Sequence, residues 1–387
     1  MAPKRRSEDA ATADLTARRR AAIGLGAGTA HDAAEWALHA PPHPDCVREA
    51  ADADRPRTTE RGEEQDGGEQ LEGLEELEEA EQSLAEFRAM GKVGRANEDG
   101  TGRWVPGPAF NEIAVLPLFS GVISAARGRK IAAQTQGFLG AFFTGMSVKI
   151  MASQLRLREE RGGRKRPSWS IIDAEQGLLF PLATLGKADG PAGVDVFAIM
   201  NVVEEYLHKP TFSIVVLTDV PIIDPEAPES TILGRATGDR VAVIGCADGA
   251  TELRLRSILG TAAHEALHCL GLDHCSLWSC LMNAYSPSEE EREADGGSST
   301  PGHRAVLSLC PLDLLKLEMA TGTIRLRRFE ALQAECTKLG FHHDANWFAR
   351  RASVCSLPRS SSLDESVAKR PKRARAERAR KSAKSRE

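Results

Sequence analysis

The chain has 387 residues, of which 50 are Lys or Arg and 55 are Asp or Glu, so its formal net charge at pH 7 is −5. No apolar stretch reaches the ~20 residues that a membrane-spanning helix needs, and Met1–Arg6 is not followed by the apolar core of a secretory signal. We therefore expect a soluble, non-secreted protein of the cytoplasm or nucleus that makes no membrane contact. Its eight cysteines are then expected to be metal ligands or free thiols rather than disulfides.

Residues 1–105 are low in complexity and are predicted to be disordered. They are rich in Ala, Arg, Glu and Gly, and the run Glu60–Glu86 holds twelve acidic residues against one arginine. Segments with so much charge and so little apolar surface generally stay solvated. The alternative is a short helix in this run that presents its leucines to a partner.

One folded domain is predicted over residues 106–350, built from alternating strands and helices. Apolar runs typical of strands occupy Glu112–Leu118, Ser147–Met151, Phe212–Val220, Ile232–Ala236 and Arg240–Ala247. Patterns typical of helices occupy Ser124–Phe138, Asp195–His208, Glu252–Leu270, Asp313–Thr321 and Ile324–Gly340, whereas the charged segment Glu159–Pro167 is predicted to be a loop. This order predicts an α/β fold in which helices cover a mixed sheet.

The segment His264–His274 carries the pattern HExxHxxGxxH, a zinc-protease signature. Because His264 and His268 are four residues apart on one helical face, both rings can reach one ion. Gly271 lets the backbone leave the helix sharply, so that His274 can return as a third ligand. Glu265 lies beside the first ligand, where its carboxylate can serve as general base. Three neutral imidazoles and a water molecule form an open zinc site of the catalytic type.

With Met282 downstream as the candidate Met-turn, this extended motif is the metzincin pattern. The residues that follow resemble one family in particular, the archaemetzincins. Cys275 comes directly after the last histidine, Cys280 comes two residues before Met282, and Cys310 stands later in the chain. The resemblance extends over about residues 106–350.

In that family four cysteines hold a second, structural zinc, so the resemblance implies such a site at Cys275, Cys280 and Cys310. This chain has Asp313 where the family has its fourth cysteine, and the stretch between Met282 and Cys310 is longer than usual. Aspartate can ligate zinc, although structural sites favour Cys and His. Three alternatives remain open: Asp313 completes the site, His303 or Cys336 substitutes for it, or the second zinc is absent.

The resemblance also implies a metzincin-like sheet, mostly parallel with one antiparallel edge strand, an active-site helix and a small C-terminal helical subdomain. An extended substrate would pair with that edge strand, for which Ile232–Ala236 is the candidate. We therefore predict a zinc-dependent metallopeptidase that acts on peptides or proteins, with an aminopeptidase-like mode as one form of that action. The alternative is a zinc-binding scaffold or regulatory protein that acts through its charged tails.

Residues 351–387 are predicted to form a disordered basic tail. From Lys369 to Glu387 there are ten basic residues and two acidic ones. A cluster of this density is typical of nuclear targeting or nucleic-acid contact, and a merely solvated tail is the alternative. Since no aromatic residue is interleaved, base stacking is not supported.

Overall fold

The fold is seen in a computed structural model of the chain. It describes residues 82–90, 105–152, 155–160, 168–186, 192–228, 230–236, 240–246, 252–275, 280–283 and 307–356. The predicted disorder of residues 1–81, most of the acidic run and the basic tail from residue 357 onward lie outside the described residues. Among the described helices, none is both long and apolar enough to cross a membrane.

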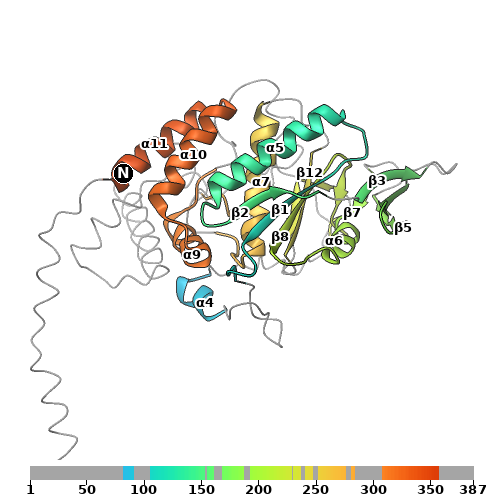
Figure 1. The fold of residues 1–387 in the computed structure, drawn as a ribbon, viewed down its shortest axis with the longest axis horizontal. Helices are drawn as coiled ribbons and strands as arrows, with labels where there is room; N and C mark the ends of the chain where they lie inside the picture. Colours follow the sequence, from blue (N-terminus) through green and yellow to red (C-terminus); the bar gives the residue numbers. More distant parts are fainter. Residues whose placement is uncertain are drawn as a thin grey trace, which may run out of the picture.

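A five-stranded sheet in the order β11-β12-β8-β1-β2 forms the centre of the fold (Figure 1). Four strands run parallel, and β11 pairs with β12 in the antiparallel direction at one edge. The strands are β1 (Glu112–Leu118), β2 (Ser147–Ile150), β8 (Thr211–Thr218), β11 (Gly234–Ala236) and β12 (Val241–Gly245). The predicted mixed, mostly parallel sheet with an antiparallel edge strand is confirmed.

Helices cover both faces of this sheet, which explains the continuous apolar runs of its central strands. Helices α5 (Ala125–Phe142) and α7 (Glu252–Cys269) pack on one face, and α6 (Val196–Glu204) packs on the other. Along β8, Val215 and Leu217 enter the first core, whereas Ile214 and Val216 enter the second. Because alternate side chains point to opposite faces, every position of β8 has to be buried.

The helical subdomain predicted near the C-terminus is present and has three helices. They are α9 (Pro311–Thr321), α10 (Arg325–Leu339) and α11 (His342–Cys355), drawn in orange and red in Figure 1. Gly322 and Gly340 follow α9 and α10 with φ of 68° and 85°, so each glycine supplies the left-handed residue that ends a helix. Helix α11 runs past the predicted domain end at residue 350.

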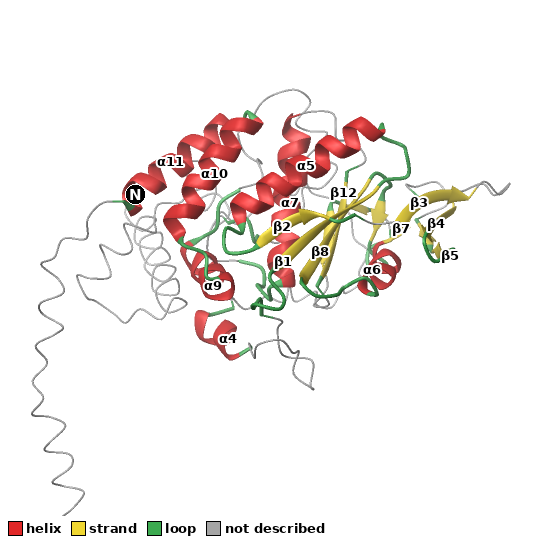
Figure 2. Cartoon of the chain, in the orientation of Figure 1, coloured by secondary structure: helices red, strands yellow, loops and turns green. Residues whose placement is uncertain are grey.

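Two small sheets flank the central one (Figure 2). The first joins β3 (Leu155–Glu160), β4 (Ser168–Asp173) and β5 (Leu178–Leu182) in antiparallel order. The predicted loop over Glu159–Pro167 is therefore wrong at its start, because Glu159 and Glu160 end β3. The second sheet has the order β10-β9-β7-β6 and contains β6 (Thr184–Leu185), β7 (Gly193–Asp195), β9 (Ile222–Ile223) and β10 (Thr231–Ile232).

The predicted strand Ile232–Ala236 is divided between two sheets. Ile232 ends β10, which pairs with β9, and Gly234 begins β11 at the edge of the central sheet. Only the second half of the predicted strand is therefore the antiparallel edge.

A short helix before the predicted domain boundary packs against the folded domain. Helix α4 (Leu84–Ala89) begins with a capping box in which Ser83 and Glu86 exchange side-chain and backbone hydrogen bonds. Leu84 and Phe87 are buried in the same core as α5, α7 and α9. The packed part of the chain thus includes residues 82–90.

Candidate metal centre

Helix α7 contains His264 and His268, the first two histidines of the motif. The chain reverses direction after the helix, which brings the third, His274, back toward them. Gly271 has φ of 80°, a left-handed conformation that favours glycine. Its N–H donates to the carbonyl of His268 at 2.8 Å, and the N–H of Leu272 donates to that of Leu267 at 3.1 Å. These two bonds close the end of the helix and turn the chain toward His274.

The Nε2 atoms of the three histidines converge. That of His268 lies 3.0 Å from the Nε2 of His264 and 3.2 Å from the Nε2 of His274. The opposite ring atoms, Nδ1 of His264 and His268, lie 2.6 and 2.7 Å from the carbonyl oxygens of Leu281 and Leu272. A carbonyl only accepts, so both Nδ1 atoms carry the proton and both Nε2 atoms present a lone pair.

This arrangement fits a metal ion. Nitrogen ligands at tetrahedral zinc are about 3.3 Å apart, as follows from Zn–N bonds of about 2.05 Å. Burial lowers the pKa of His264 to about 4 and that of His268 to about 3, so both rings are neutral near pH 7 and able to ligate. Converging lone pairs repel one another unless a cation lies between them.

Glu265 lies next to the histidines and is almost completely buried, at 7% exposure. Burial raises the pKa of Glu265 to about 8, while Arg235 and the backbone N–H of Ala236 act to lower it. A cation at the histidines would lower this pKa further, which favours the carboxylate form needed in a general base.

Glu265 also contacts the edge strand β11, a contact that was not predicted from the sequence. A Cβ at Gly234 would lie 3.0 Å from Cγ of Glu265 and 2.5 Å from Cγ2 of Thr261. Only glycine therefore lets β11 approach α7 this closely. A glycine inside a short strand is the signal that could have indicated it.

Met282 is fully buried, and a tight turn surrounds it. Its carbonyl accepts from the N–H of Cys275 at 2.7 Å. The Asn283 side chain fastens the turn, since its Oδ1 accepts from the N–H of Cys280 and its Nδ2 donates to the carbonyl of Cys275, both at 2.6 Å. Asn283 is a further residue that the sequence analysis missed.

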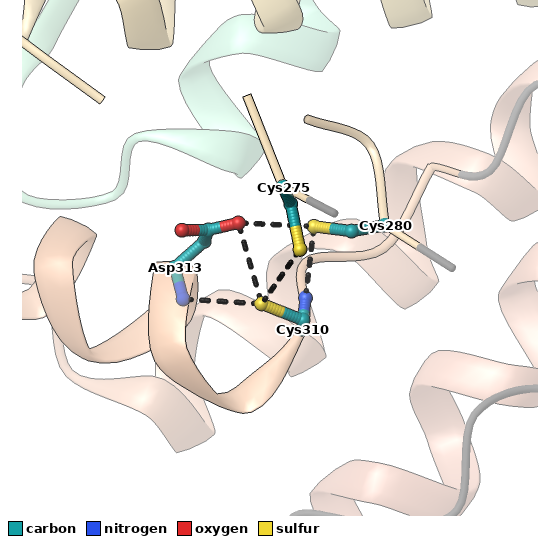
Figure 3. A group of neighbouring side chains, drawn as sticks. All are labelled: Cys275, Cys280, Cys310 and Asp313. Carbon is teal, nitrogen blue, oxygen red and sulfur yellow. Dashed lines mark hydrogen bonds between the residues drawn. The ribbon is translucent and has the colours of Figure 1, made fainter. Parts of the chain in front are cut away.

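A second group of potential ligands lies beyond this turn (Figure 3). We call it the cysteine–aspartate cluster; its members are Cys275, Cys280, Cys310 and Asp313. Their ligand atoms all lie within 4.8 Å of one another, and all four residues are buried. Within the described part of the chain, Cys336 is not a member of this group, and His303 lies outside the described residues. None of the described cysteines forms a disulfide.

The cluster also has the dimensions of a zinc site. The sulfurs of Cys275 and Cys310 are 3.9 Å apart, and Oδ2 of Asp313 lies 3.2 Å from the sulfur of Cys280 and 3.3 Å from that of Cys310. Tetrahedral zinc with Zn–S bonds of about 2.3 Å places two sulfurs about 3.8 Å apart, and a sulfur and an oxygen about 3.5 Å apart.

Backbone N–H groups point at two of these sulfurs. The N–H of Cys310 donates to the sulfur of Cys280 at 3.2 Å, and the N–H of Asp313 donates to the sulfur of Cys310 at 3.3 Å (Figure 3). Burial raises the pKa of both thiols and of Asp313, so a cation is needed to keep the cluster ionised. The donor N–H groups then stabilise thiolate acceptors.

Gln82, just before α4, contacts the loop between the second and third histidines. Its Nε2 donates to the carbonyl of Gly271 at 3.1 Å and to Oδ2 of Asp273 at 2.8 Å. Gln82 is 4% exposed although it lies within the acidic run Glu60–Glu86. No local pattern in the sequence indicates this long-range contact.

The chain matches no protein-family model. Among curated proteins, Archaemetzincin-2 of Pongo abelii and that of Homo sapiens are each 37% identical over 82 residues, and that of Macaca fascicularis is 34% identical over 82 residues. This segment of the chain is similar to the archaemetzincins. The matched segment is 21% of this chain and 20% of each of these archaemetzincins, so it spans about a fifth of their length.

Solved archaemetzincin structures are also similar to this chain. The archaemetzincin of Methanopyrus kandleri has a TM-score of 0.37 and 17% identity, covering 57% of this chain and 99% of its own. The archaemetzincin of Archaeoglobus fulgidus, complexed with malonate, has a TM-score of 0.32 and 19% identity, and the match covers 53% of this chain and 99% of that one. A zinc-dependent peptidase of Methanocorpusculum labreanum has a TM-score of 0.33 and 14% identity, and the match covers 53% of this chain and 99% of that one.

Proposed function

We propose that this protein is a zinc-dependent metallopeptidase whose zinc is held by His264, His268 and His274. The observation that carries the proposal is the convergence of three Nε2 atoms on one point, with a buried carboxylate beside them. The similarity to archaemetzincins supports it.

A zinc ion bound there would supply a Lewis acid that activates water and polarises the scissile carbonyl. Glu265 would accept the proton of the attacking water and later deliver it to the leaving amine. The burial of Glu265 favours this second step, because burial raises the pKa of the carboxyl group and so favours the protonated form that acts as an acid.

The edge strand supports an extended peptide as substrate. Strand β11 is the last strand of the central sheet, and the N–H of its residue Ala236 reaches Glu265. A peptide added beside β11 through backbone hydrogen bonds would pass the histidines. Whether it is cleaved internally or from its N-terminus depends on how far the peptide extends past them, and the aminopeptidase-like mode is the one we propose to test first.

The decisive experiment is hydrolysis of a peptide library by the full-length protein, with and without a chelator. Glu265→Gln should retain zinc and lose at least 100-fold in kcat, because removal of a general base typically costs 10²–10⁴-fold. His268→Ala should lose both zinc and activity. Glu330→Gln is the matched control, since it changes an exposed glutamate on α10.

Hydrolysis that survives in Glu265→Gln would refute the role of Glu265. Zinc that is bound without any chelator-sensitive hydrolysis would favour the scaffold alternative. Libraries with free and acetylated N-termini distinguish the two modes of cleavage, because an aminopeptidase-like enzyme cleaves only the free set.

We also propose that the cysteine–aspartate cluster binds a second, structural zinc, on the geometry given above. A cytoplasmic or nuclear location and nucleic-acid contact through the basic tail remain proposals that rest on sequence alone. Imaging the full-length protein and a variant without residues 369–387 would show where the protein is located and whether the basic tail determines that location.

A further inference from the structure

Two fully buried cations lie around the cysteine–aspartate cluster. Lys316, one turn after Asp313 on α9, has a side chain with 1% exposure, and Arg328 on α10 is 0% exposed. Burying a cation without a compensating charge is strongly unfavourable. Their positions therefore require an anionic group nearby.

Lys316 contacts Asp313 from the side opposite to the sulfurs. Its Nζ lies 3.1 Å from Oδ1 of Asp313, while Oδ2 of the same carboxylate faces Cys280 and Cys310. The ion pair is not aligned as a hydrogen bond, and Nζ has no hydrogen-bond partner among the described residues. Lys316 thus holds one oxygen and leaves the other for the cluster.

Arg328 approaches the cluster from the other helix. Its Nε donates to the carbonyl of Phe142 at 3.0 Å, and its guanidinium lies 4.2 Å from the centre of the Phe142 ring. Its Nη2 has no partner among the described residues. Glu318, Cys280 and Cys336 each contribute a favourable electrostatic interaction to this cation, that of Glu318 being the largest. Glu318 is also engaged by Arg325 through two bonds of 2.6 and 2.8 Å, so the two arginines share its charge.

The occupied cluster is anionic. Three thiolates and one carboxylate around a divalent cation carry a net charge of −2, which the buried charge of Lys316 partly offsets. The exposed carboxylate of Glu86 on α4 also interacts with Lys316, but it lies in solvent, where its field is screened.

We propose that Lys316 is the positioning residue that makes Asp313 a zinc ligand, and that its buried charge is a counter-charge of the occupied cluster. In this arrangement the pair Asp313–Lys316 takes the place of a fourth cysteine. The inference rests on the second zinc site proposed above, and it is independent of peptidase activity.

Cobalt substitution tests this proposal in the full-length protein. Of the two groups of potential ligands in the described part of the chain, only the cluster has sulfur, so sulfur-to-cobalt charge-transfer absorption reports the cluster and not the histidines. Wild type should bind two metal ions per chain, one of which gives this absorption. Competition with a chelator of known affinity then gives the affinity of the cluster.

Lys316→Met keeps the length of the side chain and removes its charge. We expect its cluster to bind cobalt at least tenfold more weakly, as is typical when a group that orients a metal ligand is lost. Lys316→Arg should recover part of the affinity, and Asp313→Cys should retain the charge-transfer band with added intensity from a fourth sulfur. Lys338→Met, which changes a lysine with 69% exposure on α10, is the matched control.

Equal affinity in wild type and Lys316→Met would refute the positioning role. One metal ion per chain without sulfur charge transfer would refute the second site, and it would leave the peptidase proposal intact. A protein that binds both ions but hydrolyses no peptide would refute the peptidase proposal and leave the second site intact. If Lys316→Met does not fold, Asp313→Asn, which leaves Lys316 in place, must show the same loss of affinity or the proposal fails.

Discussion

Glu265 should make the stability of the metal-free protein depend on pH. Burial raises its pKa from the ordinary 4.5 to about 8, so the folded protein holds this proton more tightly than the unfolded chain does. The resulting stabilisation is complete below the unfolded pKa and is lost as the pH rises through the folded one. Glu265→Gln removes the titration while it nearly preserves the shape of the side chain.

The magnitude follows from the two pKa values. A tenfold difference in proton affinity is worth about 1.4 kcal/mol, so between about pH 5 and about pH 8 wild type should lose about 3 kcal/mol relative to Glu265→Gln. Burial lowers the pKa of His264 and His268, which destabilises the fold toward acid pH. Both proteins share that effect, and it largely cancels in the difference.

Urea unfolding of the chelator-treated proteins, followed by circular dichroism over this pH range, measures the difference directly. We expect the midpoint of the Gln variant to rise above that of wild type as the pH increases. Glu330→Gln should follow wild type at every pH. A difference between wild type and Glu265→Gln that is the same at all pH values would refute the reasoning.

Two further changes test how the site is held. Gly234→Ala would place a Cβ 3.0 Å from Cγ of Glu265, so we expect kcat to fall at least tenfold with zinc retained. The control is Gly140→Ala on α5, where a Cβ meets nothing within 4 Å. It should leave activity unchanged and add up to about 1 kcal/mol of stability. Normal kcat in Gly234→Ala would contradict the close approach of β11. Asp344→Ala breaks the paired bonds of 2.8 and 2.9 Å from Arg256, which join α7 to α11, and should cost about 3 kcal/mol in urea unfolding. A loss within experimental error would mean that this ion pair does not fix α7.

The parts of the fold that sequence predicted are those set by local patterns. The continuous apolar run of β8 and the spacing of α7 each indicated their structure, because burial on two faces or on one helical face leaves a regular trace. Strand β3 also has a local pattern, which was not recognised in the sequence. Leu155 and Leu157 are buried, whereas Arg156 and Arg158, which alternate with them, are exposed. The high charge of this segment obscured its period of two.

The candidate site divides in the same way. The histidines and Glu265 lie within one helix and its end, so their spacing indicated their convergence. The resemblance gave Asp313 as one of three alternatives for the fourth ligand, and in the structure its carboxylate lies beside the three cysteines. Neither Lys316 nor Gln82 could be found from sequence, because a buried lysine and a glutamine within an acidic run have no distinctive pattern, and their partners are set by tertiary structure.

The contact between Gln82 and Gly271 has a consequence for the order of folding. The two residues are 189 positions apart in the chain. Contacts of such separation cost more loop-closure entropy than local ones and tend to form late. The turn that carries His274 toward the other histidines is thus fastened by a segment that precedes the first strand of the sheet. The local bonds of Gly271 and Leu272 can close the end of α7 early, whereas a newly made chain would add the Gln82 contact only after α4 has packed beside it.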